Sequence, residues 1–233
     1  MTRTLYIGNK NYSSWSMRPW VLMTQVGIPF TEQRVRFDSF EADSHFKQAL
    51  LGINPVGKVP ALVEPALGTQ AAIWDSLAIC EYLAESYPDL HLWPVDKAAR
   101  ARARSVCAEM HSGLGQLRSH FPMNIEAHLP DVGARLLQEQ AGLRTDLQRV
   151  VQMWQSALAH SNGPMLFGAF SIADAFFAPV CMRLRSYATP LPADIQAYVD
   201  RVVALPSVAR WIREALAEKD FLPFEEPYRQ APT

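Results

Sequence analysis

The chain has 233 residues, a formal net charge of −1 and an apolar content of 49%. A chain of this size can bury a substantial core and suits two modest domains. Because its charge is close to zero and its basic residues are scattered, we expect neither nucleic acid nor a membrane as a partner. Residues 1–3 lead directly into an apolar strand without the pattern of a signal peptide, and no apolar run could span a bilayer, so a cytoplasmic location is expected.

The sequence lacks the patterns of three common chemistries. Its cysteines, Cys80, Cys107 and Cys181, are odd in number and have no metal-binding spacing, which argues against a disulfide framework. The six histidines form no i, i+4 pair with a flanking glutamate, so no metal is expected. No serine lies in the Gly-x-Ser-x-Gly elbow of a hydrolase.

The first elements in chain order are a buried strand over 4–7 and a helix over 16–26. Ser16 is a suitable N-cap, and Gly27 is a suitable C-terminal stop. Five further elements follow: a strand near 32–36, a helix over 41–50, strands over 61–63 and 70–73, and a helix over 76–87. The order βαβ, then α, then ββα predicts a thioredoxin-like arrangement.

The remainder of the chain has helical periodicity. Residues 88–94 are the expected linker, with Trp93 packing between the domains. Helices are predicted over 96–121, 133–160, 172–186, 194–204 and 207–219. Ser171 and Asp174 have the spacing of a capping box, and the proline-bearing tail over 221–233 is expected to lie on the surface.

Ser13 and Ser14 lie at the junction between the first strand and the first helix. The free amides and the positive end of the helix dipole favour a bound anion there. A thiolate is such an anion, and one hydroxyl donor could stabilise it by about 1.4 kcal/mol, or about one pKa unit. Read alone, the serines are also ordinary helix caps.

Two further segments have features of a peptide-binding site. If the Val59-Pro60 bond is cis, the Val59 backbone can pair with an extended peptide, whereas a trans proline would be an ordinary loop residue. Asp75 and Ser76 open a helix, where the serine and nearby amides could hold a carboxylate and the aspartate could accept from an ammonium group. Read alone, that pair only caps an amphipathic helix.

Together, in this order, the three segments resemble the cytosolic glutathione S-transferase superfamily with a serine-type site. The resemblance implies an α/β thioredoxin-like N-terminal domain over 1–87, a linker over 88–94 and an all-α second-substrate domain over 95–233. It also implies glutathione as co-substrate and a homodimer.

The resemblance also assigns roles to residues. Val59 would pair with the cysteinyl backbone of glutathione, Asp75 and Ser76 would hold its γ-glutamyl end, and Lys58 and Pro60 belong to the same expected binding set. In theta-like and delta-like members the thiol-activating serine lies four residues before the arginine of the first helix. Counting back from Arg18 gives Ser14.

Ser13 and Tyr12 are rival donors to the sulfur, whereas Tyr6 lies within the predicted strand. The pattern Ser-Ser-x-Ser-x-Arg is also similar to the zeta class, but Trp15 replaces its cysteine and Met17 its tryptophan. This departure weakens the transfer of maleylacetoacetate isomerase activity. It also removes the nucleophile needed for disulfide chemistry.

The second substrate is expected to bind the helical domain. Met110, His111, Leu114 and Arg118 lie within about two helical turns, and the last three share one face. With Tyr12, they form a candidate pocket for an electrophile bearing a carboxylate or carbonyl. His111 and Arg118 could instead serve a dimer interface or satisfy buried backbone groups.

The resemblance predicts an enzyme that conjugates the glutathione thiolate to a small, largely apolar electrophile. Two alternatives stay open. One is a glutathione-dependent cis-trans isomerase similar to maleylacetoacetate isomerase, and the other is a non-catalytic glutathione- or ligand-binding scaffold.

Overall fold

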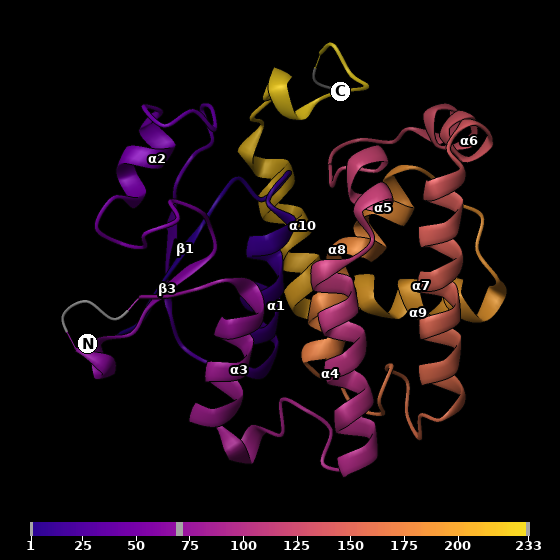
Figure 1. Ribbon diagram of the computed structural model, residues 1–233, viewed down its shortest axis with the longest axis horizontal. Coiled ribbons are helices and arrows are strands. Elements are labelled where there is room, and N and C mark those ends of the chain that lie inside the picture. The colour runs from indigo at the N-terminus through magenta and orange to yellow at the C-terminus, as the bar shows by residue number, and fades with distance from the viewer. Residues whose placement is uncertain (1, 69–71, 232–233) are drawn as a thin grey trace.

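The computed structural model describes residues 2–68 and 72–231, and it consists of a sheet-containing N-terminal domain and a helical C-terminal domain (Figure 1). This architecture confirms the predicted fold class. The N-terminal domain contains β1 (Thr4–Ile7), α1 (Ser14–Val26), β2 (Thr31–Arg34), α2 (His45–Leu50), β3 (Ala61–Val63), β4 (Ala72–Trp74) and α3 (Ser76–Ser86). The strand predicted over 70–73 corresponds to β4. Residues 70 and 71 of that prediction lie outside the described residues.

The described strands form one mixed sheet in the order β2-β1-β3-β4. β1 and β2 are parallel, with Thr4 opposite Thr31, so they need a crossover, which α1 provides. β3 runs antiparallel to both β1 and β4. In Figure 1, α1 and α3 lie between the sheet and the C-terminal helices, whereas α2 lies on the outer side.

The C-terminal domain contains α4 (Lys97–Ser112), α5 (Gly115–His120), α6 (Pro130–Glu139), α7 (Ala141–Ala159), α8 (Ile172–Ser186), α9 (Ala193–Ala204) and α10 (Pro206–Glu218). α8 is buried along nearly its whole length and packs against α1, so one hydrophobic core runs through both domains. The capping box at its start is confirmed, because the Asp174 carboxylate accepts from the Ser171 amide at 2.9 Å. Within the described part of the chain, no helix is both long and apolar enough to cross a membrane.

The first helix begins earlier than predicted. α1 starts at Ser14 with Ser13 as its N-cap residue, so the expectation that Ser16 caps the helix is wrong. The Ser16 hydroxyl instead accepts from the Gly8 amide at 3.2 Å and from the Ser13 hydroxyl at 2.7 Å. Ser14 therefore lies in the first turn, beside the positive end of the helix dipole. Gly27 ends the helix in the left-handed conformation, as expected.

The helix predicted over 96–121 is interrupted. Gly113 follows the last residue of α4, and Leu114, with a φ of 55°, turns the chain into α5. A Cβ on Gly113 would lie 2.8 Å from the Glu109 carbonyl oxygen, so only glycine fits this turn. The prediction over 133–160 is likewise divided at Gln140 into α6 and α7, and the helix predicted over 41–50 is limited to α2.

The C-terminal tail is anchored and does not simply lie on the surface. Leu222 is buried, and the buried Glu226 carboxylate accepts from the Tyr12 hydroxyl at 2.6 Å and from the Asn124 amide at 2.8 Å. The expected surface position holds for exposed residues such as Pro223 and Phe224, but these polar groups on both domains also fix the tail in place. The tail consequently covers one side of the first strand-to-helix junction.

Candidate functional site

Two cavities meet at the loop before β3. The Val59-Pro60 peptide bond is cis, and no hydrogen bond of the Val59 backbone is found among the described residues. The first, which we call the Asp75 cavity, has a volume of about 440 Å³, and the second, the Ser14 cavity, about 560 Å³. Both are lined by Trp15, Lys58 and Val59, so a ligand lying along Val59 would reach into both.

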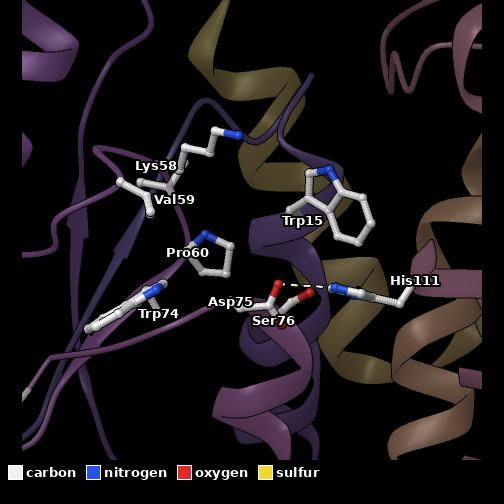
Figure 2. Close-up of a pocket in the computed structure, with 9 residues that line it drawn as sticks. Trp15, Lys58, Val59, Pro60, Trp74, Asp75, Ser76 and His111 are labelled. Atoms are coloured by element: carbon white, nitrogen blue, oxygen red, sulfur yellow. Dashed lines mark ion pairs between the residues drawn. The ribbon is translucent and has the colours of Figure 1, made fainter. Parts of the chain in front are cut away.

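The Asp75 cavity is lined by every residue that was predicted to bind the parts of glutathione other than its sulfur. Figure 2 shows the loop of Lys58, Val59 and Pro60 on one side, and the start of α3 below it. His111 reaches in from α4 of the C-terminal domain. The lining residues are Trp15, Val56, Lys58, Val59, Pro60, Trp74, Asp75, Ser76 and His111.

Asp75 has two roles in this cavity, one for each carboxylate oxygen. Oδ1 accepts from the amides of Leu77 and Ala78, at 2.8 and 3.3 Å, and so caps α3. Oδ2 lies 3.1 Å from Nε2 of His111, the dashed pair in Figure 2. The φ of Asp75 is 77°, a conformation that few residues other than glycine and asparagine adopt readily.

Ser76 and His111 both carry buried polar atoms without a partner. The Ser76 hydroxyl and Nδ1 of His111 form no hydrogen bond with any described residue, although both atoms are buried. Such groups are costly unless a ligand or solvent satisfies them. A ligand with a carboxylate and an ammonium group can bond to Ser76 and Asp75 together.

The Ser14 cavity lies over the start of α1 and brings the three candidate donors together. Tyr12, Ser13 and Ser14 all line it. Its apolar wall is formed by Phe37, Phe40, Phe46, Pro122 and Met123.

The hydrogen bonds distinguish the three donors. The Tyr12 hydroxyl donates to Glu226, and the Ser13 hydroxyl donates to Ser16. The Ser14 hydroxyl only accepts, from Nη2 of Arg183 at 3.0 Å, and has no acceptor among the described residues. Of the three, Ser14 alone keeps its proton for a ligand.

The protonation of Tyr12 also disfavours it as an activating group. Burial, together with the hydrogen bond to Glu226, raises the pKa of Tyr12 to about 12. A phenol with a raised pKa is a poorer proton donor to a thiolate than an ordinary tyrosine. The buried cysteines offer no rival nucleophile, because burial raises the pKa of all three thiols: Cys80, Cys107 and Cys181.

The polar wall of the Ser14 cavity is strongly basic, although the whole chain has a net charge of −1. Lys47, Lys58, Arg118 and Arg183 line it, against a single carboxylate, Glu225. Burial raises the pKa of Glu225 to about 7, so that carboxyl is partly neutral near physiological pH. The cavity therefore favours a ligand with negative charge.

The predicted second-substrate residues are separated by the turn between α4 and α5. His111 lies in the Asp75 cavity, on the glutathione side, and Arg118 lines the Ser14 cavity. Met110 and Leu114 are buried in the core and line neither cavity. The predicted common face of His111, Leu114 and Arg118 is wrong, because the turn at Leu114 redirects the chain.

The sequence did not identify Arg183 or Glu225 as site residues. Arg183 lies within an α8 segment that is otherwise apolar from Phe176 to Leu184, and a lone charge in such a run is a usable signal of a buried function. Glu225 lies in a short 3-10 turn of the tail, and no local pattern distinguishes it.

Comparison with known proteins finds a match for each domain of the chain. Residues 12–86 match the family model of the glutathione S-transferase N-terminal domain, and residues 97–214 match that of the C-terminal domain. A probable maleylacetoacetate isomerase of Caenorhabditis elegans is 34% identical over 115 residues, which span 49% of this chain and 49% of that relative.

Two further proteins extend the comparison. Mouse glutathione S-transferase theta-1 is 33% identical over 97 residues, which cover 41% of this chain and 37% of that one. A glutathione transferase homologue from Burkholderia, solved with bound glutathione, superposes with a TM-score of 0.65 at 24% identity, covering 92% of this chain and 98% of its own. At that identity the structural match establishes the fold alone.

Proposed function

Because the chain belongs to the glutathione S-transferase family, we propose that it conjugates glutathione, through its thiolate, to a small, largely apolar electrophile. Glutathione lies along Val59, with its γ-glutamyl end in the Asp75 cavity and its thiol in the Ser14 cavity. The cavities adjoin at Val59, as an extended peptide requires.

The γ-glutamyl end is held by complementary charge. The carboxylate accepts from the Ser76 hydroxyl, which has no partner among the described residues, and the ammonium group donates to Asp75. His111 holds the Asp75 carboxylate from the other domain. Most of the binding energy for glutathione therefore comes from the Asp75 cavity.

The observation that supports the chemical step is the uncommitted proton of Ser14. Its hydroxyl donates to the sulfur and stabilises the thiolate, with the N-terminal end of α1 behind it. The sulfur attacks an electrophilic carbon held against the apolar wall. A sulfur–carbon bond forms while the leaving group departs with its electron pair, and Ser14 is not covalently modified.

Glutathione-dependent cis-trans isomerisation is a second candidate, and one observation favours it. The lysines and arginines that line the Ser14 cavity suit an unsaturated diacid. A relative that matches just under half of the chain is named a probable maleylacetoacetate isomerase. In that reaction the sulfur adds to the double bond, rotation follows, and the sulfur leaves again.

Product analysis after incubation with glutathione and a panel of electrophiles tests both candidates. Aryl halides, epoxides and unsaturated diacids belong in the panel. We expect a thioether to accumulate as glutathione is consumed. An isomerised diacid with glutathione unchanged would replace the transferase with the isomerase. Failure to bind glutathione at millimolar concentration would contradict both and favour a scaffold.

A further inference from the structure

Arg183 is a buried cation of α8 whose guanidinium reaches the start of α1. It is 4% exposed. Nη2 donates to the Ser14 hydroxyl at 3.0 Å, and Nη1 donates to the carbonyl of Phe121. The bond to Ser14 joins the C-terminal domain to the serine that faces the second cavity, whereas the bond to Phe121 lies within the C-terminal domain.

No carboxylate forms a salt bridge with Arg183 among the described residues. Two further arginines raise the local positive charge: Arg18, from α1, and Arg118, from α5. Burial lowers the pKa of Arg183 to about 10, with Tyr187 opposing the shift, Arg118 adding to it and Glu225 opposing it, so Arg183 stays charged at neutral pH. Buried charge without a counterion is costly. An anion in the adjoining cavity would offset that cost.

We propose that Arg183 is a positioning residue of the reaction: by occupying a lone pair of the Ser14 oxygen, it leaves the single hydroxyl proton to point at the glutathione sulfur. The proposal rests on the proposed function of Ser14 and extends it to a residue 169 positions away in the sequence.

Hydroxyl chemistry gives the reason. A serine hydroxyl has one proton and two lone pairs. An arginine can only donate, so its bond to Ser14 excludes the arrangement in which Ser14 donates in that direction. Donation from a cation also strengthens the hydrogen bond that the hydroxyl makes in turn. The thiolate is the acceptor that benefits.

The charges around Arg183 come from several elements. Arg18 and Arg118 add positive charge, Tyr187 follows the end of α8, and Glu225 faces the cavity from the tail. Glu225 is the one carboxylate in this group, and burial favours its neutral form below a pKa of about 7. Near neutral pH it is only partly ionised, so it offsets part of the positive charge beside Ser14.

The test compares Arg183→Met, Arg183→Lys and, as a matched control on the same helix, the exposed Arg185→Met. The thiol pKa of bound glutathione is followed by the ultraviolet absorbance of the thiolate. Arg183→Met should raise that pKa by about one unit, a tenfold loss of thiolate, with glutathione affinity within about threefold. Arg183→Lys should recover part of the shift, and Arg185→Met should match the wild type.

A double variant tests whether Arg183 acts through Ser14. Ser14→Ala with Arg183→Met should shift the thiol pKa by clearly less than the sum of the single shifts. A fully additive shift, or an unchanged pKa in folded Arg183→Met, would overturn the proposal. A wild type that binds no glutathione, or leaves its thiol at the solution pKa, would overturn the proposed function instead.

Arg183→Met removes the bond to Ser14, which also joins the two domains. A second measurement therefore leaves Arg183 unmutated. With ¹⁵N-labelled arginine, the exchange of the Arg183 Nη protons with solvent is compared between the wild type and Ser14→Ala. Loss of the acceptor should accelerate exchange several-fold. Exchange that stays unchanged would overturn the proposal.

Discussion

The two cavities on either side of Val59 differ in how they are built. The Asp75 cavity takes its carboxylate and its hydroxyl from one short segment, the start of α3, whereas the Ser14 cavity combines side chains of α1, α5, α8 and the C-terminal tail. In the function we propose, the first cavity binds the charged end of glutathione and the second sets the protonation of its sulfur. On that proposal, affinity and thiol activation are separable, and mutations can test each one alone.

The largest expected effect is on affinity, at Asp75. Asp75→Asn keeps the helix cap and tolerates the φ of 77°, but it removes the charge that accepts from the ammonium group. Loss of a charged hydrogen bond of about 1.5 to 3 kcal/mol should weaken glutathione binding by about 10-fold to 100-fold. Calorimetry measures the affinity, and the bound thiol pKa should stay at the wild-type value. A change in both the glutathione affinity and the bound thiol pKa would show that the two cavities do not act separately.

The part of the site that could be predicted from the sequence also differs between the Asp75 cavity and the Ser14 cavity. Asp75, Ser76 and the Val59-Pro60 loop are contiguous segments, and the family resemblance was enough to predict that they lie together, as they do in one cavity. The link between Ser14 and Arg183 joins residues 169 positions apart, and it depends on how α8 packs on α1. Periodicity also missed the turn at Leu114, because a continuous apolar face and a broken one look alike in sequence.

A smaller effect on affinity is expected at His111. His111→Gln keeps a donor near Asp75 but replaces the imidazole that lies 3.1 Å from its carboxylate, so it should weaken glutathione binding by about threefold, or about 0.7 kcal/mol. The exposed His128→Gln is the matched control. If His111→Gln instead raised the Michaelis constant for the electrophile and left glutathione affinity unchanged, His111 would belong to the second-substrate side.

The smallest effect is a pH dependence at Glu225. Its folded-state pKa of about 7 lies above the ordinary value of 4.5, so the folded protein binds more protons than the unfolded chain between those values. The free energy of unfolding contributed by this group therefore falls as pH rises through that window. Glu225→Gln should flatten the fall in Tm between about pH 4.5 and pH 7.

Exposed Glu85→Gln provides the control for that pH series, and it should follow the wild-type curve. An unchanged slope in Glu225→Gln would show that Glu225 is not held in an apolar setting. The Ser14 cavity would then be more evenly charged than its lining indicates.

The most direct test of Ser14 as the thiol donor is the pKa of bound glutathione in the wild type, Ser14→Ala and Ser13→Ala. Because the Ser13 proton is committed to Ser16, only Ser14→Ala should raise the thiol pKa, by about one unit. An unchanged pKa in Ser14→Ala, or an equal rise in Ser13→Ala, would contradict the assignment of the hydroxyl of Ser14 as the donor.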